Sequence, residues 1–409
     1  MKRVALLCMG LVLGAATAAE AQLTMQMSNG WSFTFAGNVN AFVTYETFSD
    51  DGNTAGVIVP AGGESETRIR TGLLPAFAVF DAKGKEGNTD LGVHFGFAPQ
   101  INCATGVHDC FGAQIDMRQV FLTVGGTWGQ VLAGRELGLF GRQNILTDQT
   151  LFGIGATGSA GVPASAAPGT GVGTTLGRIG FGYNYPQFKA QMTYSTAAGR
   201  PLQLSIGLFE AASNGPYDKV EIPRLEAEAV WNSENGNTKL WAGGLLQTNK
   251  SIATDESASS YGVSGGAKIG GARFSLTGSG FYGMGIGTTL NFNGGTCVGG
   301  TCGSNGADDL RTSYGFIGQA TFTPKDSKFT FAASYGSNFL EASDTESGGG
   351  DKAKIENNLI SGGLYIQSTK SLKIVIEGNY ATGKDSGPGE DATEDNSSFA
   401  PAFGLMLFF

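Results

Sequence analysis

The feature that most limits what this chain can fold into is an alternation of apolar and polar residues that returns along almost its whole length. Residues 31–45 show it first, with aromatic and β-branched side chains on one face and Ser, Thr and Asn on the other. This period of two is typical of a strand that crosses a membrane at a tilt. One such strand would also suit a soluble β-sandwich, so only repetition of the pattern along the chain indicates a membrane barrel.

The pattern recurs in later segments that bring the total to sixteen. They cover residues 67–80, 91–97, 118–124, 130–135, 178–194, 202–208, 225–231, 239–247, 261–269, 274–282, 311–322, 329–335, 359–367, 372–380 and 398–409. A bulge and a turn near Pro186 fit residues 178–194 equally well, but a barrel with both chain ends on one side needs an even number of strands, which favours the bulge. The sequence therefore predicts an all-β fold, a transmembrane antiparallel β-barrel of sixteen strands.

Composition agrees with a barrel in a membrane. Charged residues make up 15% of the chain, against about 25% in soluble globular proteins, and 66 of the 409 residues are Gly, more than twice the usual share of about 7%. After Gln22 no apolar run approaches the length of about 20 residues that a membrane-spanning helix needs. Small polar side chains would face water and apolar ones would face lipid.

The N-terminus indicates export. Residues 1–14 have a basic start and an apolar stretch, and Ala19–Ala21 forms a small-residue cleavage site. We therefore expect residues 1–21 to be a signal peptide and residues 22–409 to be one barrel domain. A membrane anchor is disfavoured because the apolar run is short, and Cys8 lies too early to be a lipid-modified cysteine.

The other cysteines form two close pairs, Cys103 with Cys110 and Cys297 with Cys302. In an exported chain, an even number of cysteines favours disulfides, and we expect both pairs to be bridged. A metal site using His108 beside Cys110 is the less favoured alternative, because few soft ligands are local there.

Enzymatic and nucleic-acid-binding functions find no support. The net charge of -9 offers no basic footprint for nucleic acid. The histidines are His94 and His108, and neither stands near a serine or carboxylate in a catalytic pattern. We expect no catalysis, no cofactor and no metal, and we expect His94 to line the interior of the barrel.

A long, almost uncharged segment follows the predicted hairpin of residues 118–135. Residues 136–177 consist mainly of Gly, Ala, Thr, Ser and Pro, with Glu136, Arg142 and Asp148 as the charged exceptions. Compact domains rarely carry so long a loop without a function for it.

The string from Arg118 to Arg135 resembles the fourth and fifth strands of the general porins of Gram-negative bacteria. In that family the next loop, the third outer loop, folds back into the barrel and narrows the pore. The resemblance implies that residues 136–177 form this constriction loop. It also implies a basic wall opposite an acidic loop, with the wall made by Arg68, Arg70, Arg118 and Arg178, the acidic groups by Glu136 and Asp148, and the loop base anchored by Arg135 and Arg142. The alternative for each arginine is a solvated residue of the interior, and Glu226, Glu228, Lys373 and Glu377 are expected to add general charge there.

The chain ends on an alternating apolar face that closes with Phe409. This ending resembles the signal by which outer-membrane barrels are recognised by the assembly machinery. We therefore expect Phe409 to direct assembly, and the resemblance also implies a homotrimer in the outer membrane.

Together these features predict an outer-membrane channel for passive diffusion of small hydrophilic solutes and ions. One alternative is a porin selective for sugars or anions, with Phe42, Phe80 and Phe209 as an aromatic track. Another is a non-conducting structural or adhesive barrel. The acidic outer loops at Asp50–Asp51, Asp308–Asp309 and 385–395 could bind divalent cations that also bridge lipopolysaccharide. The favoured interpretation is that their charges only keep the loops hydrated.

Overall fold

The computed structural model describes residues 23–50, 65–99, 101, 115–157, 174–212, 217, 219–253, 255, 257–288, 309–344, 346–347, 350–386 and 393–409. The predicted signal peptide, the four cysteines of the predicted disulfides, Asp51 and Asp308 lie outside these residues.

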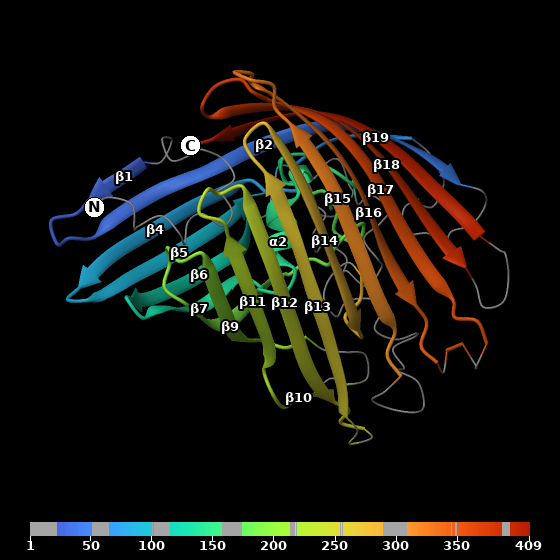
Figure 1. Cartoon of the computed structure of the whole chain (residues 1–409), viewed down its shortest axis with the longest axis horizontal. Helices are drawn as coiled ribbons and strands as arrows, with labels where there is room; N and C mark the ends of the chain where they lie inside the picture. The colour runs from blue at the N-terminus through green and yellow to red at the C-terminus, as the bar shows by residue number, and fades with distance from the viewer. Residues whose placement is uncertain are drawn as a thin grey trace.

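Within the described residues, sixteen antiparallel strands close into a barrel (Figure 1). They are β2 (Ser32–Asp50), β4 (Phe77–Glu86), β5 (Thr89–Pro99), β6 (Ile115–Gly126), β7 (Gly129–Leu137), β8 (Phe188–Ser195), β9 (Leu202–Phe209), β11 (Arg224–Asn232), β12 (Thr238–Lys250), β13 (Ser257–Gly270), β14 (Phe274–Met284), β15 (Thr312–Phe322), β16 (Phe329–Glu341), β17 (Lys354–Gln367), β18 (Leu372–Ser386) and β19 (Thr393–Phe408). Each pairs with the next, and β19 pairs with β2 to close the ring. The predicted fold class and strand number are confirmed.

Three short strands extend this wall. β1 (Leu23–Gln26) and β3 (Glu66–Arg70) pair with β2, and β10 (Lys219–Val220) pairs with β12. Closure matters because an open sheet edge would leave backbone polar groups unpaired in lipid. The described residues include the helix α2 (Arg142–Thr147) and the 3-10 helix η2 (Gln149–Phe152), and they contain no helix long and apolar enough to cross a membrane.

The alternation seen in the sequence sorts the side chains onto two faces. On β9 the side chains of Leu204, Ile206 and Leu208 are about half exposed, whereas Ser205 and Phe209, at alternate positions, are buried. The register carries this division from strand to strand, so the exposed apolar positions form a continuous outer face. The intervening positions form an inner face.

One predicted strand, residues 67–80, is interrupted. β3 ends at Arg70 and β4 begins at Phe77, while the six residues between them are buried. Inner-face amides hold this break: Asn40 Nδ2 donates to Leu74 O at 2.9 Å and Asn38 Nδ2 donates to Pro75 O at 3.1 Å. Pro75 has no N–H for a ladder hydrogen bond, which explains why alternation alone was misleading here.

A second prediction was wrong in its boundary. Residues 178–187 do not form part of a strand, and β8 begins only at Phe188. Arg178 opens a tight turn in which Gly180 N donates to Tyr183 O at 2.9 Å, with Gly180 at a φ of 80°. Ile179, Phe181 and Tyr183 are buried, so they alternate for reasons of packing rather than of strand structure.

Candidate functional site

The candidate site is the segment that connects β7 to β8. We call its described residues, 138–157 and 174–187, the loop segment. It includes α2 and η2, and most of its side chains are buried. Its contacts reach inner-face residues of strands that are far apart around the ring.

The start of the loop segment is bound to β11. Glu226 is fully buried, and its Oε2 accepts hydrogen bonds from Leu139 N at 2.7 Å and Phe140 N at 2.9 Å. A carboxylate that accepts two backbone N–H groups is a strong, charge-assisted anchor. Glu226 was expected to supply general charge in the interior, and the structure gives it a structural partner instead.

An ion pair lies next to this anchor. Arg142 Nη2 lies 2.5 Å from Glu228 Oε1, and Gln143 Nε2 donates to Glu228 Oε2 at 3.0 Å. Burial alone would lower the pKa of Arg142, but the Glu228 carboxylate outweighs burial and raises this pKa. The contact joins α2 to the wall.

The middle of the loop segment is held by strands farther around the ring. Trp241 Nε1 of β12 donates to Asn144 Oδ1 at 2.8 Å. The amide of Gln319 on β15 bridges two positions, since its Oε1 accepts from Gln149 N at 2.7 Å and its Nε2 donates to Thr147 O at 3.1 Å. The two helices are therefore fixed by neutral hydrogen bonds as well as by charge.

Asp148 stabilises the loop segment internally. Its side chain accepts from Thr150 N at 2.9 Å, which caps η2, and from the Tyr183 hydroxyl at 2.6 Å. Burial, reinforced by the adjacent Asp148 carboxylate, raises the pKa of Tyr183 well above its ordinary value. The Asp148 oxygens are therefore engaged within the loop segment, and its carboxylate also acts on Arg178.

On the opposite side, β18 binds the turn after η2. Glu377 Oε2 accepts from Ile154 N at 2.7 Å and Gly155 N at 3.0 Å, and the Tyr365 hydroxyl donates to its Oε1. A Cβ at Gly153 would lie 2.2 Å from Glu377 Oε1. A larger residue at position 153 would therefore displace the Glu377 carboxylate or the turn that it binds.

The two arginines of β3 have different surroundings. The register places both on the inner face, opposite Phe42 and Thr44. Arg70 is buried and its Nη2 donates to Thr174 O at 2.7 Å, whereas the partly exposed Arg68 lies 2.6 Å from Glu66 on its own strand. Arg70 is thus a contact between wall and loop segment.

Arg178 belongs to the loop segment and not to the wall, which corrects the prediction. It is fully buried and donates to Ser334 Oγ on β16 and, at 2.9 Å, to Leu359 O on β17. Burial lowers the pKa of Arg178, yet a guanidinium remains charged in proteins. Nearby, Gly182 N donates to Asn338 Oδ1 at 2.7 Å.

Arg118 lies on β6 with its own carboxylate partner. Its Nε donates to Asp116 Oδ2 at 2.7 Å, and its guanidinium lies 5.9 Å from the centre of the Phe188 ring. The charge of Arg118 is therefore partly balanced by a residue of the same strand.

Glu136 lies at the end of a series of hydrogen-bonded polar side chains that the sequence did not predict. Gln119 Nε2 donates to Glu136 Oε2 at 2.8 Å, His94 Nε2 lies 3.3 Å from Gln119 Oε1, and His94 Nδ1 lies 3.0 Å from Asp81 Oδ1. This series of side chains crosses the inner faces of β4 to β7. His94 was predicted on this face, but its partners lie on other strands, and no sequence spacing marks them.

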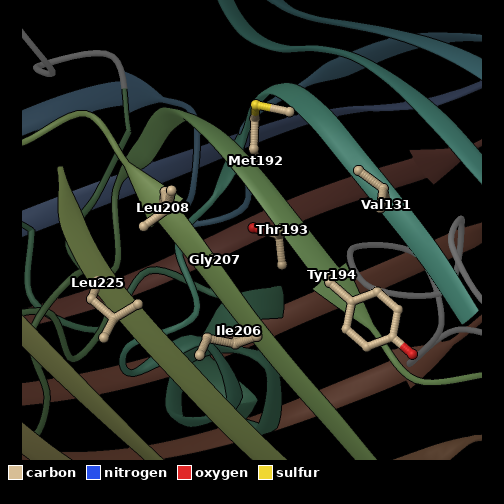
Figure 2. A pocket seen from close by; sticks show the side chains of 8 residues that line it. All are labelled: Val131, Met192, Thr193, Tyr194, Ile206, Gly207, Leu208 and Leu225. Carbon is tan, nitrogen blue, oxygen red and sulfur yellow. The ribbon is translucent and has the colours of Figure 1, made fainter.

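Arg135 does not anchor the loop. It is exposed on β7 and shares the face of Val131, which lines the outer groove shown in Figure 2. This groove is shallow and apolar, with side chains contributed by β7, β8, β9 and β11. It lies on the outer face, so it is separate from the loop segment.

The aromatic track considered as an alternative is not continuous. Phe42 and Phe209 are buried on the inner face, but Phe80 lies on the outer face, where its ring stacks on Phe35 with 4.8 Å between centroids. Phe42 packs with loop residues such as Ile154 in the largest apolar cluster.

The contacts among the described residues differ from the predicted arrangement of a basic wall opposite an acidic loop. Wall carboxylates bind the loop segment instead, and Arg70 and Arg178 bind backbone carbonyls. In the part of the chain that the structure describes, no group of three or more His, Cys, Asp or Glu side chains is placed to hold a metal ion.

A scan against models of known protein families finds no match, and a search of curated proteins finds no relative. Solved structures do match. The outer membrane channel DcaP of Acinetobacter baumannii has a TM-score of 0.65 at 15% identity, over 94% of this chain and 99% of that chain. OmpT of Vibrio cholerae has a TM-score of 0.55 at 13% identity, over 95% of this chain and 100% of that chain. OmpF of Salmonella typhi has a TM-score of 0.54 at 12% identity, over 93% of this chain and 100% of that chain. At these identities the likeness concerns the fold, and the chain has the fold of the outer-membrane porins of Gram-negative bacteria.

Proposed function

We propose that this protein is an outer-membrane channel for the passive diffusion of small hydrophilic solutes and ions, with the loop segment lying inside the barrel as its constriction. The observation that carries the proposal is the set of hydrogen bonds from the loop segment to inner-face residues on strands as far apart as β3, β11, β15 and β18. A segment outside the barrel would have no access to these side chains.

The two faces of the wall support a membrane channel. The outer face exposes apolar side chains along its strands, which a protein in water would bury. Examples that are about half exposed are Leu204, Ile206, Val263, Phe316, Ile360 and Leu405. The inner face carries hydroxyl and amide side chains, including Ser264, Thr277, Ser279, Gln319, Ser361 and Asn379. A barrel of this strand number leaves room for water in its interior.

Packing of the loop segment supports a narrow pore. Buried residues of the loop, including Ile145, Leu151 and Ile154, join wall residues such as Phe42 and Met406 in one apolar cluster. Such contacts fill part of the cross-section and leave the solute path where polar inner-face residues remain. We therefore expect a lower conductance than an unobstructed barrel of sixteen strands would show.

Several further expectations are part of the proposal. The mature chain begins at Gln22, both cysteine pairs are bridged, and the barrel assembles as a homotrimer in lipid and lipopolysaccharide. Among the similar structures, OmpT of Vibrio cholerae is known in a trimer form.

Single-channel recording tests the function. Purified protein added to a planar bilayer should produce stepwise ion conductance. Protein that inserts as a folded barrel and leaves the bilayer insulating would contradict a channel and favour the structural or adhesive alternative.

A further inference from the structure

Two lysines are neighbours on the inner face of β12 and β13. Lys239 of β12 and Lys268 of β13 are directly opposite each other in the strand register. Their chain neighbours Leu240 and Ile269 are 44% and 57% exposed on the outer face, so the lysines point inward. Like charges directly opposite in a sheet are destabilising, and a balancing group is therefore expected.

The protein does not supply that group within the described residues. No carboxylate there forms an ion pair with Lys239 or Lys268, and the carboxylate that acts on Lys239 is Glu228, which Arg142 and Gln143 already occupy. Arg142 adds a third positive charge near Lys239. This part of the interior therefore carries an excess of positive charge.

A hydroxyl group completes the set of donors. Thr277 of β14 is directly opposite Lys268, it is 5% exposed, and its Oγ1 has no hydrogen-bond partner among the described residues. On the other side, the Trp241 ring covers Gly266, where an added Cβ would lie 2.3 Å from the ring. Two lysines and a threonine thus occupy one row of the register on the inner face, next to Trp241.

Resting on the proposed channel function, we propose that Lys239, Lys268 and Thr277 form an oxyanion-binding subsite for small solutes that carry a carboxylate or phosphate group. A bound oxyanion relieves the repulsion between the lysines and accepts charge-assisted hydrogen bonds from both. Lys373 shows the contrast. Its ammonium lies 3.6 Å from the centre of the Phe152 ring, so a cation–π contact with the loop segment already engages that charge.

Equilibrium dialysis with inorganic phosphate tests the subsite on the folded mature protein in detergent. The double variant Lys239→Gln/Lys268→Gln should bind phosphate about tenfold more weakly or worse, since charged hydrogen bonds are lost. Thr277→Val should show a smaller loss, about threefold, because a neutral donor is removed. Lys325→Gln removes an exposed charge from the turn between β15 and β16, and it should bind like the wild type.

Unchanged binding in the double variant, or an equal loss in Lys325→Gln, would overturn the subsite. Heat-modifiable mobility on gels checks that every variant remains a barrel. Reversal potentials in a bilayer separate the two proposals, since the double variant should become more cation-selective. If the wild type conducts and the double variant binds phosphate as strongly as the wild type, the subsite alone is refuted. If the double variant loses phosphate binding but the wild type never conducts, the subsite is retained and the channel is refuted.

Discussion

The barrel wall and the loop segment are held in place by different kinds of interaction. Backbone ladders join each strand of the wall to the next, and the ring closes where β19 pairs with β2. The loop segment is held by side chains of the wall, above all by the carboxylates Glu226, Glu228 and Glu377. The structure of the wall therefore depends on the alternating sequence pattern, whereas the position of the loop segment depends on individual side chains. Mutations should affect the wall and the loop segment separately.

The largest effect is expected from deletion of Phe409, which damages the wall alone. Its backbone N donates to Gly37 O at 3.0 Å and its O accepts from Gly37 N at 2.8 Å, and its ring packs on Phe35. These contacts lock the seam between the first and last strands of the ring. We expect protease-sensitive, unassembled protein, measured as loss of the heat-modifiable band. Wild-type yields of the barrel would count against this role.

The next effect should be confined to the loop. Glu228→Gln leaves Arg142 buried without its charged partner, and breaking a buried pair costs about 3–5 kcal/mol. Hydrogen exchange of residues 139–147 should become correspondingly faster, while the barrel remains heat-modifiable.

A matched control comes from an exposed pair. Lys85 and Asp90 lie 2.8 Å apart with both side chains 60% exposed. Lys85→Gln should change local stability by about 1 kcal/mol or less, because solvent screens such pairs. Equal effects of Glu228→Gln and Lys85→Gln would remove the distinction between loop and wall.

The sequence predicted the wall well because each strand presents one face to lipid and one to the interior, so the period of two follows directly from the fold. The exceptions have physical causes. Pro75 interrupts a segment that otherwise alternates, and residues 178–187 alternate because they are buried, which mimics a strand.

The site was far less predictable. Alternation placed Glu226 and Glu377 on the inner face, but their partners are backbone N–H groups of Leu139, Phe140, Ile154 and Gly155. Every non-proline residue carries such a group, so no residue type in the sequence marks the contact. Arg178 and Asp148 were assigned to the pore from the porin resemblance, which does not specify their partners Leu359 O and the Tyr183 hydroxyl.

A smaller effect is expected from Gly153→Ala. The added methyl group would meet the Glu377 carboxylate, so either this side chain or the turn after η2 must shift. Overpacking of this kind typically costs about 1–3 kcal/mol, and we expect an altered single-channel conductance with normal assembly. Gly318→Ala on β15 is the control, since nothing lies within 4 Å of its added Cβ. Identical recordings from both variants would contradict the tight approach at position 153.

The smallest effect should come from Arg68→Gln. Arg68 is partly exposed and paired with Glu66, so its net contribution to the field in the pore is modest. We expect a slight shift of the reversal potential towards cations, with unchanged conductance. A shift larger than that of Lys239→Gln/Lys268→Gln would move the main selectivity site to β3.

We infer that wall carboxylates hold the loop segment inside the barrel, where it limits the current. The sharpest test is the single-channel conductance of Glu226→Gln/Glu377→Gln, which weakens the carboxylate hydrogen bonds at Leu139 and Ile154. The variant also removes the charged partner of Arg224 on β11, so assembly of the wall is checked first. We expect a larger and noisier conductance from a barrel that still shows heat-modifiable mobility. A correctly assembled double variant with wild-type conductance and noise would contradict it.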